Sequence, residues 1–239
     1  SATLNVVIPT VTTTFFSDNF DTNSASLWTV NSSSPDTRVT FNYNYATNGI
    51  LSAPNSTGGT TRGVKFEANM ALGVVAAICV SPTGKSFTGD YDLKFDLWIN
   101  ANGPFPDGGT GSSQHITSGL GTAGNKVQWG SAGSTADGSW FAVDGEGQAA
   151  NGVNSDFLAF IGPTQQTTNS GIYSAGTAGN ARQSTHSYYA IPFPEGQTAP
   201  ASQISAYPNQ TGQMSAGAVG FKWRNVLIRK TGNKVEWFI

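Results

Sequence analysis

The sequence predicts an all-β domain, an antiparallel sandwich of two sheets. Apolar residues alternate with polar ones in short runs, Gly, Asn, Ser and Pro separate these runs, and no stretch repeats apolar residues at helical spacing. The composition agrees, because 29 of the 239 residues are Gly and only 11% are charged. The 6 Trp, 7 Tyr and 14 Phe are spread along the chain and are enough to build a core.

The N-terminal part is predicted to be extended. Residues 1–14 are rich in Thr and Val and form either a linker or a first edge strand. Residues 15–239 are expected to form a single domain, because β sandwiches often reach this length as one unit. Its first clear strand is 39–45, in which aromatic residues alternate with small polar ones.

The clearest strand is 91–99, with apolar side chains at every second position facing the core. Asp92, Lys94, Asp96 and Trp98 therefore face the other way. The two acids lie about 13 Å apart on such a strand, with a cation between them, which is wider than the roughly 5–9.5 Å that paired glycosidase carboxyl groups need. These residues are therefore interpreted as a charge-balanced, exposed strand face.

The rest of the chain alternates between loops and short strands. Residues 186–191 are read as a strand with Tyr188 and Ala190 on one face, and Thr231-Gly232-Asn233 is predicted to join two strands, 219–230 and 234–239, as a hairpin. The segments rich in Gly, Ser and Thr are interpreted either as surface loops or as walls of a binding groove, with equal weight. They are 101–125, 163–185 and 194–218.

Several function classes find no support in the sequence. The formal net charge is -2 with scattered basic residues, which argues against nucleic-acid binding, and no apolar run approaches the roughly 20 residues of a membrane span. Zinc spacings, phosphate-binding glycine loops and serine-nucleophile elbows do not occur. The single cysteine, Cys79, lies in an apolar run and is expected to be a buried, inert thiol.

Four short motifs resemble the concanavalin A-like lectin/glucanase superfamily, in particular the laminin-G-like jelly-roll domains of secreted bacterial proteins. They are FSDNFD at 16–21 followed by Leu27-Trp28, GSWFAVDGEG at 138–147, FKWRNVLI at 221–228 and NKVEWFI at 233–239. The resemblance implies a two-sheet antiparallel jelly roll, a secreted or cell-surface location, and sugar binding on the concave sheet or its rim. Such domains continue with an Asp-Gly turn and a final strand, so the sequence is expected to be truncated at its C-terminus.

The expected function is that of a carbohydrate-binding or adhesive module of a larger secreted protein. The alternatives are a polysaccharide-cleaving enzyme, either a glycoside hydrolase or a lyase, and a structural surface or matrix domain without a ligand. The predicted ligand-binding residues are Trp98, Asp96 and Trp140, because sugar rings stack on indole while acids accept hydrogen bonds from hydroxyl groups. For Trp98 the alternative is a position beneath one of the long loops.

Catalytic residues are not expected, but four side chains are weak candidates. Asp144 and Glu146 are placed close together by the intervening glycine, although such a sequence also suits a plain exposed loop. His115 and His186 are the only histidines in the chain, and a structural role is the better interpretation of each.

A calcium ion is a further expectation. Asp18 and Asp21 could supply two carboxylates at the start of the domain, and the resemblance implies an ion that ties the first strand to the sandwich. The alternative is that these aspartates only cap a turn.

Overall fold

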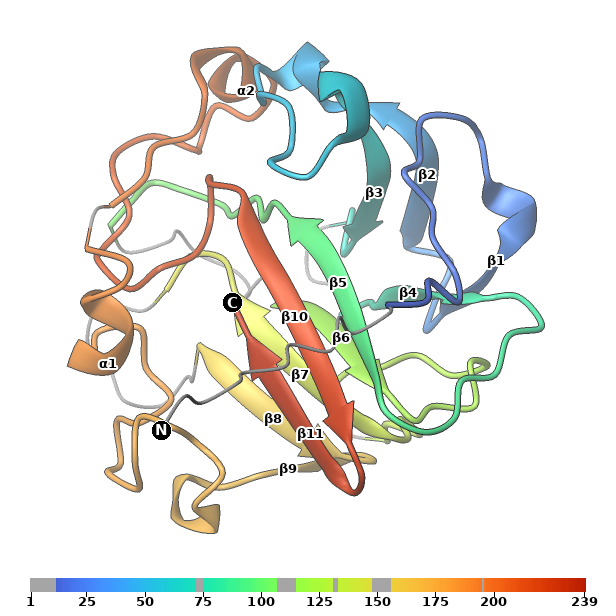
Figure 1. The fold of residues 1–239 in the computed structure, drawn as a ribbon. Helices are drawn as coiled ribbons and strands as arrows, with labels where there is room; N and C mark the ends of the chain where they lie inside the picture. Colours follow the sequence, from blue (N-terminus) through green and yellow to red (C-terminus); the bar gives the residue numbers. More distant parts are fainter. Residues whose placement is uncertain (1–11, 72–74, 107–114, 131–132, 148–155, 195) are drawn as a thin grey trace, which may run out of the picture.

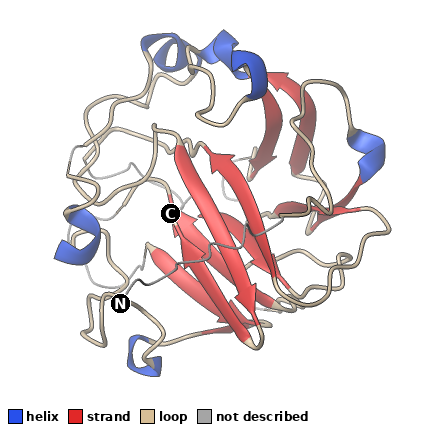
Figure 2. Ribbon diagram, in the orientation of Figure 1, coloured by secondary structure: helices blue, strands red, loops and turns tan. Residues whose placement is uncertain are grey.

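The computed structural model describes residues 12–71, 75–106, 115–130, 133–147, 156–194 and 196–239. Within these ranges the chain is mostly antiparallel β-strand with a few short helices (Figure 2), so the expected all-β class is confirmed. The residues predicted as a linker or edge strand, 1–14, lie largely outside the described part. No helix in the described part is long and apolar enough to cross a membrane.

The strands are short and the helices shorter. The strands are β1 Trp28–Ser32, β2 Thr37–Asn44, β3 Arg62–Ala68, β4 Ile78–Pro82, β5 Tyr91–Leu97, β6 His115–Leu120, β7 Ser139–Asp144, β8 Phe157–Ile161, β9 Thr164–Gln165, β10 Arg224–Thr231 and β11 Lys234–Phe238. The α-helices are α1 Ser187–Ala190 and α2 Ala201–Ala206, and the 3-10 turns are η1 Ala25–Leu27, η2 Tyr45–Asn48, η3 Thr57–Gly59 and η4 Thr168–Ser170.

The described strands form four antiparallel sheets. Two of them are pairs, β1-β4 and β2-β3, a third has the order β11-β10-β5, and the fourth has the order β6-β7-β8-β9. In Figure 1 the two larger sheets lie one behind the other, while β1, β2, β3 and β4 lie to one side of them.

The main core lies between the two larger sheets. Trp237 of β11 stacks on Phe141 of β7 with ring centroids 5.3 Å apart, and the buried apolar residues come from both sheets and from the loops around them. Leu97 and Ile99 are buried in this core, and the apolar residues at 91, 93 and 95 pack against it. The alternation predicted for residues 91–99 is therefore confirmed, and burying this face in the core favours folding.

The charged residues of β5 face outward, as their alternation predicts. Asp92 accepts two hydrogen bonds from Arg229 of β10, at 2.8 and 2.9 Å, and lies 3.5 Å from the ammonium of Lys94. The hydrogen bonds from Arg229 hold the pKa of Asp92 below its usual value. These contacts give the charge-balanced strand face that the sequence predicts.

The predicted strand at 39–45 exists as part of β2, but a bulge interrupts its alternation. The pairing with β3 shifts register between Thr40 and Tyr43, and Asn42 has a positive φ of 59°. Asparagine tolerates this backbone conformation better than most residues. The Asn42 side chain donates to the carbonyls of Phe20 and Asp21, so the bulge attaches β2 to the start of the domain.

The C-terminal hairpin is confirmed, with a loop of Gly232 and Asn233 between the paired Thr231 and Lys234, but its first strand begins at Arg224 and not at 219 as predicted. Gly232 has a φ of 56°, which glycine adopts without steric cost, and its N–H donates to Asp90 at 2.7 Å.

The strand predicted at 186–191 is wrong. This segment is the short helix α1, and His186 is its N-cap, because the imidazole Nδ1 accepts a hydrogen bond from the N–H of Tyr188 at 3.1 Å. A side-chain acceptor at this position satisfies an N–H group that has no partner inside the helix. The apolar alternation over so few residues did not distinguish a strand from one helical turn.

A second, smaller core forms where the segment after β5 meets α2 and the residues before β10. It contains Ala101, Phe105, Ala199, Met214, Ala218 and Phe221, with Trp98 and Ile204 packed against it. Part of the segment predicted as a long loop, 194–218, is therefore packed structure rather than surface loop.

Candidate functional site

A polar cleft opens beside β1, where it is lined by residues of the segments 125–129 and 133–135. Its volume is about 460 Å³, and its walls include Asn31 and Ser32 from β1 together with Asn125, Lys126, Trp129 and Thr135. The sequence offered three segments as groove walls. Of these, 101–125 contributes Asn125 to the cleft, and none of the described lining residues comes from 163–185 or 194–218.

Hydrogen bonds hold the segment after β6 against β1 and β4. The Asn31 side chain donates to the Gly124 carbonyl at 3.0 Å, and the Cys79 thiol donates to the Lys126 carbonyl at 3.3 Å. The hydroxyl of Thr117 on β6 donates to the Gln128 carbonyl at 3.0 Å. The cleft is therefore bounded by strands and by a segment tied to them, which limits the ordering cost of binding.

Cys79 pairs with Asn31 of the cleft wall but is not among the residues that line the cleft. The thiol is partly buried, and burial raises its pKa above the usual value, which disfavours the reactive thiolate. The prediction of a weakly reactive thiol agrees with this position, although the burial is only partial.

Four side chains of the cleft are available to a ligand. Within the described residues, the side chains of Asn125, Trp129 and Thr135 and the ammonium of Lys126 make no hydrogen bond to the protein, and Asn125 and Thr135 are exposed. Ser32 and Asn31 are already bonded to Ser34 and Gly124 respectively. An indole beside an amide, a hydroxyl and an ammonium combines an apolar surface with hydrogen-bonding groups in one concavity.

A second feature is a cluster of buried carboxyl groups at the C-terminal end of β7. Asp144, Glu146 and Asp156 are 2%, 7% and 1% exposed. The expectation of a plain exposed loop at 144–146 is therefore wrong. His115 pairs with Asp144 across β6 and β7, and its Nε2 lies 4.0 Å from the Asp144 carboxylate.

Glycine explains how the turn at 144–147 enters the interior. A Cβ atom on Gly147 would come within 2.9 Å of Ser184 and Ala218, and the Gly145 carbonyl accepts a hydrogen bond from Gly220 at 2.9 Å. The missing side chains let the turn pack directly against neighbouring backbone. The glycines between and after Asp144 and Glu146 therefore allow the turn that carries these acids to pack in the interior.

Burial and the two neighbouring carboxylates raise the pKa of Glu146 to about 8. One oxygen of its carboxyl group, Oε2, is buried and has no hydrogen-bond partner among the described residues. The Asp144 carboxylate accepts the N–H of Glu146 at 2.9 Å, and the Asp156 carboxylate accepts the N–H of Ser184 at 2.6 Å. Glu146 is therefore protonated at neutral pH and flanked by hydrogen-bonded acids.

The structure brings together three of the four weak catalytic candidates, Asp144, Glu146 and His115, and adds Asp156, which sequence reasoning missed. Asp156 lies 12 residues from Asp144 in sequence, so no short motif links them. The fourth candidate, His186, caps α1 and has the structural role that was its better interpretation.

The predicted ligand-binding residues Asp96 and Trp98 are occupied by contacts within the protein. Asp96 accepts hydrogen bonds from the Asn55 backbone and side chain, at 2.7 and 2.8 Å, and from the Asn225 side chain. Trp98 packs edge-on against Trp223, with centroids 5.7 Å apart, and donates to Asn100 at 2.9 Å. The second core partly buries Trp98, so its position is close to the alternative in which other parts of the chain cover the indole.

Trp140 is in the core, which corrects its prediction as a sugar platform. It is fully buried, and its indole stacks on Phe160 with centroids 3.8 Å apart and planes 5° from parallel. Its N–H donates to the Gly162 carbonyl at 2.8 Å. A ligand therefore has no face of this indole to stack on.

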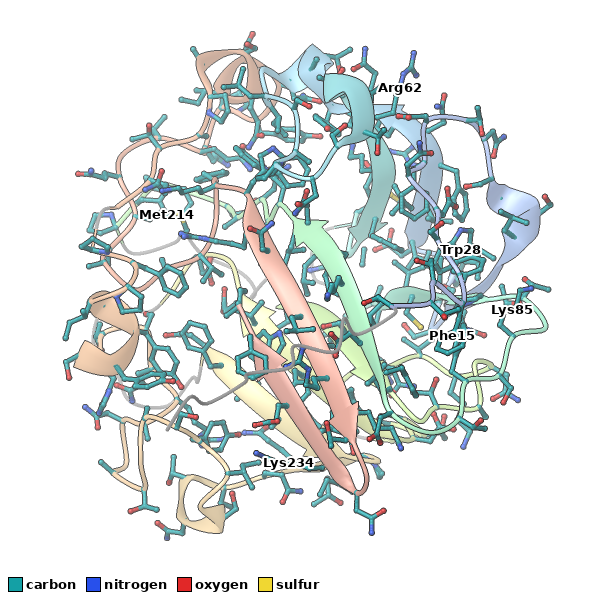
Figure 3. All side chains as sticks on the ribbon, in the orientation of Figure 1. Phe15, Trp28, Arg62, Lys85, Met214 and Lys234 are labelled. Atoms are coloured by element: carbon teal, nitrogen blue, oxygen red, sulfur yellow. The ribbon has the colours of Figure 1, made fainter. Side chains whose placement is uncertain are left out.

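Asp18 and Asp21 fasten the start of the domain through hydrogen bonds. Asp18 accepts from the Phe20 N–H at 2.9 Å and from the Trp28 indole at 2.7 Å, and Asp21 accepts from Asn19 at 2.7 Å and Thr60 at 2.6 Å. Trp28, which is labelled in Figure 3, also stacks on Phe20.

All four carboxylate oxygens of Asp18 and Asp21 thus accept hydrogen bonds from the protein. The bond from the Phe20 N–H fits the turn-capping alternative, whereas those from Trp28 and Thr60 join the turn to distant segments. Across the described ranges, no group of three or more His, Cys, Asp or Glu side chains is arranged to hold a metal ion. A calcium ion at this position stays a prediction.

Lys126, Trp129 and the other cleft residues were missed by sequence reasoning. The available signal was the segment GNKVQWG at 124–130, which places a cation and an indole close together between glycines. Comparisons with protein-family models, with curated proteins and with solved structures give no match to this chain.

Proposed function

We propose that this chain is a carbohydrate-binding or adhesive module of a larger secreted or cell-surface protein, with its ligand site in the cleft beside β1. The single observation that carries the proposal is the group of cleft side chains around Trp129 that make no hydrogen bond within the described part of the chain. They belong to Asn125, Lys126 and Thr135, and the Trp129 indole makes none either. Sugars present apolar C–H faces that stack on indole and hydroxyl groups that bond to amides and hydroxyls. The cleft offers both kinds of contact in one concavity.

The finer fold assignment belongs to the same proposal. The motifs at 16–21, 138–147, 221–228 and 233–239 support a jelly roll of the concanavalin A-like superfamily. The antiparallel sheets and the core between the two larger ones are consistent with it.

Replacement of Trp129 by Ala tests the proposal. We expect wild-type protein to be retained by at least one polysaccharide in a glycan array or in affinity electrophoresis, and Trp129→Ala to lose that retention without a change in Tm. Tyr188→Ala is the matched control, because Tyr188 is an exposed aromatic on α1, which Figure 1 places across the molecule from β1. Retention unaffected by Trp129→Ala contradicts the proposed site.

A second candidate function is polysaccharide cleavage, which the raised pKa of Glu146 favours, because a carboxylic acid kept protonated at neutral pH is the form needed for general acid catalysis. Its burial weighs against access by a polymer. A reducing-end release assay on the retained polysaccharide, with Glu146→Gln as the comparison, tests this candidate. Release that Glu146→Gln abolishes identifies an enzyme, and binding without release identifies a module.

A further inference from the structure

We propose that the cleft beside β1 selects anionic glycans, whose sugar units carry carboxylate or sulfate groups, through Lys126. This inference rests on the proposed function and names the ligand class of the same site.

The described lining of the cleft carries a positive charge. Of the described residues that line it, Lys126 is the one with a charge, and none carries a carboxylate. The chain as a whole is slightly acidic, with a formal net charge of -2. The cation in the cleft is therefore a local feature and not part of a generally basic surface.

Among the described residues, the acid that pairs with Lys126 is Asp137. Its carboxylate lies 3.7 Å from the Lys126 ammonium, beyond hydrogen-bond distance. One of its oxygens accepts from the Gln128 side chain at 3.1 Å, and the other accepts from the Ala123 N–H at 3.1 Å. Asp137 is thus held by the segment around the cleft, and its attraction for Lys126 is that of a weak, solvent-screened ion pair.

The Lys126 ammonium has N–H donors available for a ligand. An ammonium has three N–H donors, and none of them meets an acceptor within the described part of the chain. The side chain is 40% exposed, so the ammonium is reachable and partly shielded from water. An anionic acceptor forms shorter and stronger hydrogen bonds with an ammonium than a neutral hydroxyl does.

Lys126 and Trp129 are close enough to act on one oligosaccharide. They are three residues apart, so their Cα atoms are separated by at most about 10 Å even in fully extended chain. A sugar ring on Trp129 and an anionic group of the same or the next unit at Lys126 fit this separation. Asn125 and Thr135 line the same cleft and supply neutral partners for hydroxyl groups.

Affinity electrophoresis with three polymers tests the inference: polygalacturonate for carboxylate, a sulfated galactan for sulfate esters, and a neutral β-glucan. The proteins are wild type, Lys126→Gln, Trp129→Ala and the charge-matched control Lys85→Gln. Lys85 is exposed and follows the end of β4 that pairs with Trp28, whereas the cleft lies at the other end of β1, at residues 30–33. We expect wild-type protein to be retarded by one or both anionic polymers and less by the glucan. Lys126→Gln should weaken that retardation about tenfold, and high salt should weaken it as well.

The possible outcomes distinguish failure of the anionic specificity from failure of the proposed function. Retardation by one anionic polymer, or by both, that Lys126→Gln weakens supports the inference and identifies which anionic group is recognised. Retardation by the anionic polymers that Lys126→Gln leaves unchanged overturns the role of Lys126. Equal retardation by the glucan with no effect of Lys126→Gln overturns the anionic specificity and leaves the proposed function standing. An equal effect of Lys85→Gln also overturns it, because the attraction is then not local. If no polymer retards the wild type, the proposed function fails together with the inference.

Discussion

Gly145 packs so closely against Ile99 that a Cβ atom on Gly145 would lie 2.3 Å from Cγ2 of Ile99. Ile99 is itself 2% exposed and belongs to the main core. The turn that carries Asp144 and Glu146 is therefore pressed against the core by a residue without a side chain.

Gly145→Ala should lower the free energy of unfolding by about 1–3 kcal/mol, because the added methyl group forces Ile99 or the turn to move in a closely packed interior. Urea denaturation followed by tryptophan fluorescence measures the change. Gly179→Ala is the control, since a Cβ atom there meets nothing within 4 Å, and it should change stability by less than about 0.5 kcal/mol. Equal effects of the two substitutions would contradict the packing argument.

Glu146 should make the protein less stable as pH rises from about 4.5 to about 8. Below this window the carboxyl group is protonated in both the folded and the unfolded state. Within it the unfolded chain loses the proton near the ordinary pKa of 4.5, whereas the folded protein keeps it until about 8. Stability therefore falls with pH, by an amount of the order of a few kcal/mol.

Glu146→Gln tests this pH dependence, because glutamine resembles the protonated acid in shape and cannot ionise. Unfolding free energies measured from pH 4 to 9 should fall more steeply in wild type than in Glu146→Gln. Hydrogen bonds from Arg38 lower the pKa of Glu67 to about 2, so Glu67 adds stability as pH rises to about 4.5, and it does so equally in both proteins. Parallel curves for the two proteins would show that Glu146 ionises normally.

Trp98→Ala should cost about 2–3 kcal/mol of folding stability, because the indole packs on Trp223 and against the second core. Trp98→Phe should recover part of the loss by keeping an aromatic ring. Urea denaturation checks stability, and the polymers of the cleft experiment check binding. Loss of glycan binding at unchanged stability would instead restore the sequence-based prediction that Trp98 is a sugar platform.

The calcium prediction is checked by chelation. If calcium binds at Asp18 and Asp21, excess EDTA should lower the Tm of wild-type protein but leave that of Asp18→Ala unchanged. Asp18→Ala should itself destabilise the protein by about 1–3 kcal/mol, because the Trp28 indole and the Phe20 N–H lose their acceptor. A wild-type Tm that EDTA does not move would mean that the hydrogen bonds alone hold this segment.

The parts of the fold that sequence reasoning predicted correctly are those with a long local pattern. Residues 91–99 alternate over the whole strand, and Gly232-Asn233 lies between two such runs, so register and turn follow from local geometry. At 186–191 the pattern is too short for this. There the acceptor on His186 and the packing of Tyr189 against Phe157 stabilise a helical turn.

For the candidate sites, the sequence by itself determined the chemistry that is available: a few acids, two histidines, scattered tryptophans and many glycines. It did not determine which tryptophan is exposed, because burial depends on which distant segments meet. Trp140 is buried because β7 is covered on both faces, whereas Trp129 lines a cleft because its segment passes beside β1. Asp156 joins Asp144 and Glu146 for the same reason, since only the pairing of β7 with β8 brings these carboxyl groups together.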